Sequence, residues 1–324
     1  MNDNPEELAA VAGDDVPAEA VEQADHHHDN EHHHAVDLEE EDDEDEEGEF
    51  VNQGVLNTRI LGPTDPRRMQ LSREERDWAL DIKDVIEGTP EINNISDFMC
   101  AQLAIIHQDD IATAVESASK LQISREEYDI RDTLEDGIVK LQILLDLNPG
   151  NNLSFSFSHQ EGCYVLVCDL GKMDMNLMKD NQNVYKSLGG AFYQNHALTP
   201  DLESIRRGVI FILECDGCTW IPRLCEMKYH EKYWAEIGGI YPFCIRQYKF
   251  FHTPMFFNMI KSLGRPFIPK DIYSKMQIGC QFPHGRLDTV YLVPSWEATK
   301  QRFLGRMAET LKLRYENERN FSLS

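Results

Sequence analysis

The sequence predicts an α/β domain that is preceded by a helical region and by a disordered acidic tail. Two nearly continuous apolar runs, Gly208–Cys215 and Phe243–Phe251, are typical of parallel strands covered on both faces. Between them, Pro222–Gly238 carries apolar side chains at helical spacing, as a crossover helix would. Strand, helix and strand in this order indicate an α/β unit with right-handed crossovers.

The first 50 residues differ in composition from the rest of the chain. They hold 21 of the 57 acidic residues and none of the 31 lysines and arginines, and the formal net charge of the whole chain is −26. Such a segment cannot bury enough apolar surface to become ordered, so we expect a disordered tail and linker over residues 1–70. Neither the tail nor the nearly balanced remainder has the basic face of a nucleic-acid binder.

The tail also contains two runs of histidine, His26–His28 and His32–His34. Imidazole nitrogens bind zinc and other transition-metal ions. Nothing in the sequence fixes a coordination geometry there, so a solvated polar tail is the simpler interpretation. We therefore predict no metal site and no resident cofactor.

The globular part begins near Leu71 with a helical region that we place at residues 71–147. Ser72–Glu75 and Ser124–Glu127 both match the capping-box pattern that opens a helix. The helix that follows the first box carries three apolar side chains on one predicted face: Trp78, Ile82 and Val85. Further helices are expected over residues 96–107, 109–121 and 133–145.

The α/β domain is placed at residues 148–316, with a short C-terminal tail over residues 317–324. Its first predicted strand is Tyr164–Cys168, and residues 180–207 are expected to be mostly helical, with Thr199 as a candidate N-cap before Pro200. A last helix should begin after Ser295 and end near Glu316. Its packing face is predicted to consist of Phe303, Met307 and Leu311, which follow helical spacing.

A short segment after the second apolar run is unusually hydrophobic. Thr253 and Pro254 suit a helix start, and Met255–Leu263 then carries apolar side chains nearly all round, whereas a surface helix shows one apolar stripe. Two interpretations remain open: a fully buried crossover helix, or a movable flap over an apolar cavity. Four cations surround this helix: Lys261, Arg265, Lys270 and Lys275.

Three short motifs, Tyr241-Pro242, His252-Thr253-Pro254 and Arg265-Pro266-Phe267, follow one another along this stretch. Together with the upstream segment Gly208–Gly217, they give the chain a pattern that resembles the CRAL-TRIO lipid-binding domain family. That family is known from retinaldehyde-binding, tocopherol-transfer and phosphatidylinositol-transfer type proteins. It shows Tyr-Pro, Asn-x-Pro and Lys-Pro-Phe, so His252 stands in place of the usual Asn and Arg265 in place of the usual Lys.

The resemblance implies a protein without enzymatic activity that binds a hydrophobic small molecule or a phospholipid. It also implies transfer of that ligand between membranes, from an apolar cavity gated by the helix over residues 254–264. The implied cavity and gate residues are Phe211, Leu213, Phe243, Ile245, Tyr248, Phe250, Phe256, Phe257, Ile260 and Phe267. Lys261, Arg265, Lys270 and Lys275 would contact a lipid head group or an anionic membrane surface.

Other interpretations of the same residues are weaker. Cys215-Asp-Gly-Cys218 invites a redox or metal role, but it falls where the family pattern has a strand-end turn. Motifs of hydrolases, phosphate-binding loops and dinucleotide sites do not occur in the chain, so we predict no catalytic residues. The alternative to lipid binding is a protein-interaction module with a vestigial lipid pocket and an acidic tail that recruits a partner.

The sequence also leads to an expected cellular location and oligomeric state. We find neither a basic start followed by an apolar run nor an apolar run long enough to span a bilayer. The eight cysteines show no regular framework and suit reduced thiols. We therefore expect a cytoplasmic monomer that contacts anionic membranes peripherally and transiently.

Overall fold

The computed structural model describes residues 60–147, 154–169, 177, 180–215, 241–253, 257, 262, 273–278 and 296–324. All of the described elements belong to one unit, Val51–Ser324. The predicted tail up to residue 59 lies outside the described residues. So do the predicted crossover helix Pro222–Gly238 and most of the predicted flap helix Met255–Leu263.

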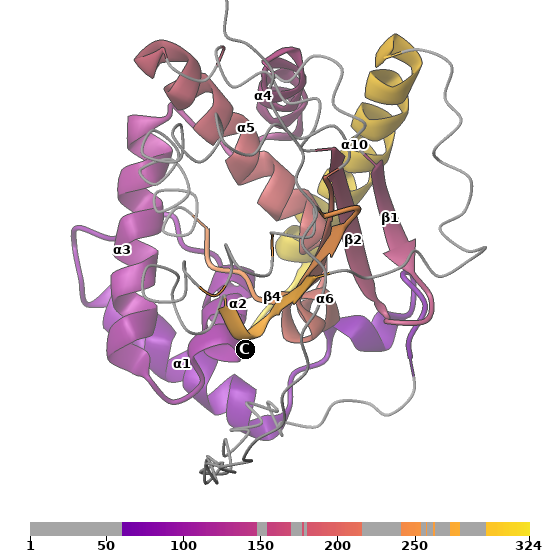
Figure 1. The fold of residues 1–324 in the computed structure, drawn as a ribbon. Helices are drawn as coiled ribbons and strands as arrows, with labels where there is room; N and C mark the ends of the chain where they lie inside the picture. The colour runs from indigo at the N-terminus through magenta and orange to yellow at the C-terminus, as the bar shows by residue number, and fades with distance from the viewer. Residues whose placement is uncertain are drawn as a thin grey trace, which may run out of the picture. The chain divides into compact units, whose positions relative to one another are not determined.

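Helices dominate the first half of this unit (Figure 1). After a single 3-10 turn, four α-helices follow, and each starts at a side chain that accepts a hydrogen bond from a backbone N–H of the first turn. Helix α1 packs against α2 and α3, and α4 packs against α5 further along the chain. The elements are η1 (Pro66–Met69), α1 (Arg73–Glu87), α2 (Asp97–His107), α3 (Ile111–Glu127) and α4 (Leu134–Asp146).

One of the two predicted capping boxes is confirmed and the other is wrong. The Ser72 hydroxyl accepts from the Glu75 N–H at 3.1 Å, and the Glu75 carboxylate accepts from the Ser72 N–H at 2.8 Å. Ser124, in contrast, lies inside α3, where its hydroxyl donates to the Lys120 carbonyl at 2.9 Å. Its helix is already capped by Asp110 and continues through the motif, so Ser-x-x-Glu here is a helix-interior sequence.

The described strands form one five-stranded sheet in the order β1-β2-β3-β4-β5. β1 runs antiparallel to β2, and the other three pairs are parallel. The predicted strands Tyr164–Cys168, Gly208–Cys215 and Phe243–Phe251 are confirmed as β2, β3 and β4, while β1 and β5 were not predicted. The strands are β1 (Ser154–Ser158), β2 (Cys163–Asp169), β3 (Val209–Glu214), β4 (Ile245–Phe251) and β5 (Met276–Ile278).

Three further helices complete the described unit: α5 (Asn181–Leu198), α6 (Leu202–Arg207) and α10 (Trp296–Asn320). α10, the yellow helix of Figure 1, packs against α4, α5 and β1. The prediction that Thr199 starts a helix is wrong, because Thr199 ends α5 and its hydroxyl donates to the Asn195 carbonyl at 3.0 Å. Asp201 caps α6 instead, accepting from the Ser204 N–H at 2.8 Å.

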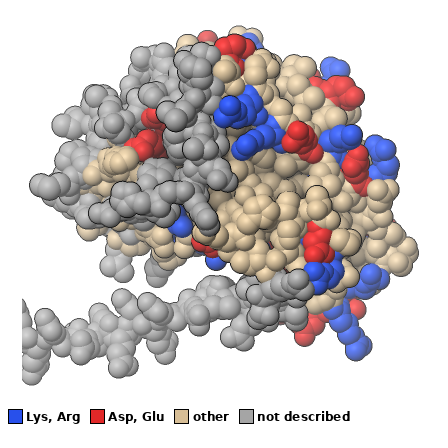
Figure 2. Space-filling model, turned by 90° about the vertical axis from the view of Figure 1, so that its right-hand side faces the viewer, with Lys and Arg blue, Asp and Glu red and all other residues tan. Residues whose placement is uncertain are grey.

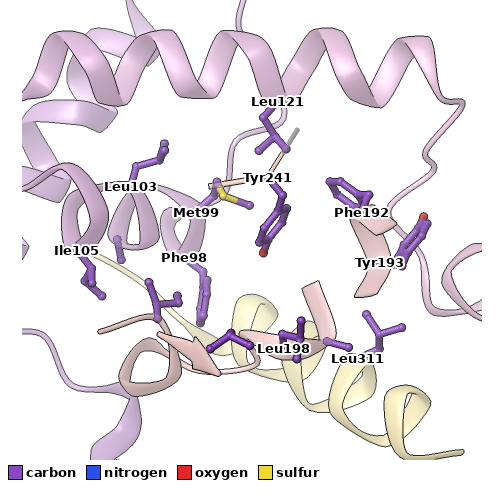
Figure 3. Packing of buried hydrophobic residues seen from close by; sticks show 14 of the residues in the cluster. Phe98, Met99, Leu103, Ile105, Leu121, Phe192, Tyr193, Leu198, Tyr241 and Leu311 are labelled. Atoms are coloured by element: carbon purple, nitrogen blue, oxygen red, sulfur yellow. The ribbon is translucent and has the colours of Figure 1, made fainter. Parts of the chain in front are cut away.

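The main core lies where α2, α5 and α10 meet β1 and β2. Figure 3 shows the helical part of this core, with labelled side chains from α2, α5 and α10. The Tyr241 ring lies in this core and meets the Phe192 ring edge-on, with centroids 5.4 Å apart. The predicted packing face of α10, Phe303, Met307 and Leu311, is fully buried there. On α1 the prediction is only partly right: Ile82 is buried, but Val85 is 45% exposed, because the buried stripe runs through Ala79 and Ile86.

Charged groups are also buried in this part of the molecule. Arg68 donates to the Asp201 carboxylate at 2.9 Å and to the Ser204 hydroxyl at 2.8 Å, and both ends of this ion pair are almost fully buried. Arg314 lies over the Phe98 ring at 3.9 Å and donates to the Thr199 carbonyl at 2.9 Å. These contacts tie the entry segment before α1 and the last helix to the loop between α5 and α6.

Candidate functional site: a partly exposed apolar strip on the sheet

The central strand β3 has two faces that are covered to different degrees. Ile210 and Ile212 point to one face, where they are only 2% and 6% exposed and pack with Val165, Val167 and Phe251. Phe211 and Leu213 point to the other face and are partly exposed. Because β3 has a parallel neighbour on each side, both of its faces would ordinarily be covered.

The register of the parallel strands extends this partly exposed face into two rows. Residues paired across adjacent strands point to the same side of a sheet. One row runs Leu166, Phe211, Tyr248 and Met276, and the next runs Cys168, Leu213, Phe250 and Ile278. We call the partly exposed members the open strip: Cys168, Phe211, Leu213, Tyr248, Met276 and Ile278.

Aromatic rings make up much of this surface. The Phe211 and Tyr248 rings stack at 5.5 Å with an interplanar angle of 27°, and the Phe243 ring lies 6.3 Å from that of Phe211. Phe257 is the described residue of the predicted flap helix that reaches the sheet. It is buried against Phe250, with ring centroids 5.3 Å apart, and against Cys215.

The structure thus brings together several of the sequence-predicted cavity residues. Phe211, Leu213, Tyr248 and Phe250 share one face, and Phe243 and Phe257 contact it. Ile245 pairs with Val209 at the start of β4, before a shift in register. Phe256, Ile260 and Phe267 lie outside the described residues, so their predicted role stays a prediction.

The predicted basic rim is described at one position. Lys275 precedes β5, and its carbonyl accepts from the Tyr248 N–H at 2.9 Å, which places it at the edge of the open strip. Lys261, Arg265 and Lys270 lie outside the described residues. Figure 2 shows basic and acidic side chains interspersed, rather than gathered by sign, over the described part of that view.

The carboxyl ends of β3 and β4 carry a polar pair that the sequence did not reveal as a pair. The His252 Nδ1 lies 2.8 Å from each oxygen of the Glu214 carboxylate. The His252 side chain is 63% exposed, whereas that of Glu214 is 16% exposed. The backbone of His252 has a φ of +47°, an uncommon left-handed conformation for a residue other than glycine.

The thiols near this face are in apolar surroundings. Burial, together with the charge of Asp169, raises the pKa of Cys168 to about 12, and burial likewise raises the pKa of Cys244. Cys215 is buried against Phe250 and Phe257, and its thiol donates to the Leu213 carbonyl at 3.5 Å. Cys218 lies outside the described residues. Within the described ranges, no group of His, Cys, Asp and Glu is arranged to hold a metal ion.

Comparison with known proteins gives only a distant likeness. No family model and no curated protein matches the chain. Among solved structures, the crystal structure of Sfh5 aligns with a TM-score of 0.42 and 16% sequence identity, over 65% of this chain and 82% of that one. A likeness of this kind is too weak to assign a family. Of the helices in the described ranges, none combines the length and apolar composition needed to cross a bilayer.

Proposed function

We propose that this protein binds a hydrophobic ligand on the open strip of the sheet. The observation that carries the proposal is the partial exposure of Phe211 and Leu213 on a central parallel strand. Leaving apolar surface in water costs about 25 cal/mol for each Å². An apolar ligand that covers this strip would recover that free energy and complete the second face of β3.

The stacked pair Phe211 and Tyr248 supports this proposal. Ligand sites are lined mainly by apolar and aromatic side chains with a few polar groups, and the Tyr248 hydroxyl adds such a group. The position of Phe257 supports a closing segment, because its ring packs against Phe250 within the same rows. We propose that the segment over residues 254–264 moves as a gate.

The free energies of transfer then favour exchange of the ligand at a membrane. Moving an acyl chain of about sixteen carbons from water to an apolar site gains on the order of 12 kcal/mol, and entry into a bilayer gains about as much. Transfer between bilayer and protein would be nearly neutral, whereas release into water would be very slow. We therefore propose that the protein takes up and releases its ligand while it is docked on a membrane, and that it carries the ligand between membranes.

The test of binding uses the full chain and two matched double variants. Phe211→Gln with Leu213→Gln changes the open strip, and Ile138→Gln with Val139→Gln makes the same kind of change at two exposed positions of α4. After incubation with phosphatidylcholine vesicles and repurification, bound lipid is extracted and measured. We expect the strip variant to lose about tenfold or more in bound lipid and the α4 variant to retain it.

Two results would overturn this proposal. If the folded strip variant retains as much lipid as the parent, the ligand does not lie on the open strip. If the parent itself takes up no lipid, the strip is better explained as part of a protein interface, which is the alternative function predicted from the sequence.

Docking is proposed to use Lys261, Arg265, Lys270 and Lys275. Each cation at an anionic surface contributes about 1 kcal/mol. Replacing Arg265 and Lys270 by Glu should therefore weaken binding to phosphatidylserine vesicles by tenfold or more at low salt. Equal affinity of variant and parent would place the docking surface elsewhere.

A further inference from the structure

Residues 321–324, which follow α10, lie against the first two helices. The Leu323 side chain is only 2% exposed and belongs to the main core. The Phe321 ring meets the Phe98 ring of α2 edge-on, with centroids 5.7 Å apart. The two serines of the segment are exposed. Its side chains therefore alternate between contact with the protein and contact with water.

The backbone of this segment is held by charged side chains of α1 and α2, beside the mark C in Figure 1. The Leu323 N–H donates to the Asp97 carboxylate at 2.9 Å, and the Leu323 carbonyl accepts from the Arg76 guanidinium at 3.4 Å. The other Asp97 oxygen lies 2.6 Å from the Lys83 ammonium. Although burial opposes it, the Leu323 N–H and Lys83 lower the pKa of Asp97, so the acceptor is an ionised carboxylate. We call Arg76, Lys83, Asp97 and Phe98 the α1–α2 site.

Both sides of this contact are also held by other interactions. α1 packs against α2, and two charged groups of the α1–α2 site already meet water, because the side chains of Lys83 and Asp97 are 32% and 22% exposed. On the other side, Arg314 and Asn317 fasten α10 through hydrogen bonds of 2.9 and 2.8 Å to carbonyls of the loop between α5 and α6. The segment can therefore leave the α1–α2 site while the helices on both sides stay folded.

The contacts define what the α1–α2 site recognises. The hydrogen bonds with Asp97 and Arg76 use only a backbone N–H and a backbone carbonyl, which almost any residue offers. Selection among sequences therefore depends on the two apolar side chains: an aromatic ring against Phe98, and a leucine in the core. Backbone hydrogen bonds combined with side-chain contacts at alternate positions are a recurrent mode of peptide recognition.

We infer that the α1–α2 site binds a segment of a partner protein that presents an aromatic residue and a leucine two positions apart. Residues 321–323 have this pattern and occupy the site until such a segment displaces them, so their contact is autoinhibitory. The inference goes beyond the proposed function and does not depend on it, because the α1–α2 site shares no residue with the open strip.

The test vacates the site in the full chain and offers a peptide in its place. Phe321→Ser with Leu323→Ser removes both apolar contacts and gives the vacated chain, and Leu323→Ser alone replaces it if the double variant does not fold. The probe is a fluorescein-labelled peptide with the sequence of residues 320–324 and blocked ends, and fluorescence anisotropy measures its binding. In the parent, the tethered segment competes at an effective concentration on the order of 1 mM. We therefore expect the vacated chain to bind the peptide about tenfold more tightly than the parent.

Three controls locate the binding. A peptide in which serine replaces both Phe and Leu should bind the vacated chain at least about tenfold more weakly. Asp97→Ala in the vacated chain should weaken binding about tenfold, because a hydrogen bond between the peptide backbone and a charged group is lost. Asp81→Ala makes the same change at an exposed acid of α1 and should leave the affinity unchanged.

Each contrary result overturns the inference. If a folded vacated chain does not bind the peptide, residues 321–324 only pack against the fold. Equal affinity of the parent and the vacated chain, or equal weakening by Asp97→Ala and Asp81→Ala, would place the binding away from the α1–α2 site. Equal binding of the serine peptide would contradict recognition of the aromatic residue and the leucine. Lipid uptake is measured separately, so failure of this inference leaves the proposed function untouched.

Discussion

One face of the sheet is closely packed at one end and partly exposed at the other. At the β1–β2 end, Phe155, Tyr164 and Leu166 are buried among side chains of α2, α5 and α10. At the β3–β5 end, Phe211, Leu213 and Tyr248 have the same apolar chemistry but remain partly exposed. Closely packed side chains stabilise the fold, whereas partly exposed ones leave room for a ligand.

The largest expected effect compares a phenylalanine from each end. Phe192 is fully buried and packs against the rings of Tyr193, His196 and Tyr241. Phe192→Ala should lower the free energy of unfolding by about 4 kcal/mol, because a large cavity remains. Phe211→Ala in the open strip should cost about 1–2 kcal/mol, because part of the ring is already in water. Urea denaturation measures the loss of unfolding free energy in both variants. Similar losses would contradict the difference in packing between the two ends of this face.

A second comparison uses two neighbouring arginines. Arg68→Met removes one partner of a buried ion pair and leaves Asp201 without its guanidinium, which should cost about 3 kcal/mol in unfolding free energy. Arg67→Met breaks only the exposed contact with Asp65 and should leave the stability unchanged within error. Thermal or urea denaturation of both variants would test this. If both substitutions lowered the free energy of unfolding by similar amounts, the buried ion pair of Arg68 would not be a specific source of stability.

The closely packed core around His196 in α5 should also make the free energy of unfolding depend on pH. Burial, and then the charge of Arg314 on α10, lowers the pKa of His196. Its Nε2 also faces Asp132 at 3.7 Å and Glu318 at 3.8 Å, and the rings of Tyr241 and Tyr315 enclose it. Although burial opposes it, the charge of Arg314 holds the pKa of Glu318 well below its usual range. The site thus favours neutral His196 and charged Glu318.

The direction of the pH effect follows from the lowered pKa. Below about pH 6.5, His196 takes up a proton more readily in the unfolded chain than in the folded protein. Stability should therefore fall as pH decreases from about 6.5, with this group contributing at most about 1.4 kcal/mol per pH unit. His196→Phe should flatten the decline measured by urea denaturation between about pH 6.5 and 5. An equally steep decline in that variant would assign the effect to other groups.

Three of the five described strands, β2, β3 and β4, were predicted from the sequence. Long apolar runs identified β3 and β4, because a parallel strand covered on both faces shows few polar residues. β1 and β5 were missed, because five and three residues are too short to give a clear pattern. The capping-box pattern predicted a helix start correctly only where it did not lie inside a longer helix, as Ser124 in α3 shows.

The candidate site was predictable in part. The sequence identified Phe211, Leu213, Tyr248 and Phe250 as apolar strand residues, but it could not distinguish Phe211 from Ile210, which is equally apolar and fully covered. The distinction depends on what packs on each face. The contact between Glu214 and His252 was not predicted either, because it depends on the register between two strands that are far apart in sequence.

The smallest expected effect concerns two cysteines whose thiol pKa values are both raised by burial. Burial raises the pKa of both Cys100 and Cys168 to about 12, so neither thiol has an advantage in forming the reactive thiolate. Cys100 lies in α2 in the closed core, whereas Cys168 is partly exposed in the open strip. Reaction of Cys100 requires local unfolding of the core, whereas reaction of Cys168 requires only access from the strip.

With N-ethylmaleimide at pH 8, peptide mass spectrometry should show Cys168 reacting several-fold faster than Cys100. Hexadecan-1-ol in phosphatidylcholine vesicles should slow Cys168 relative to the same vesicles alone, without changing Cys100. Equal slowing of both would indicate that the ligand stabilises the whole fold, and no slowing would place the ligand away from β2.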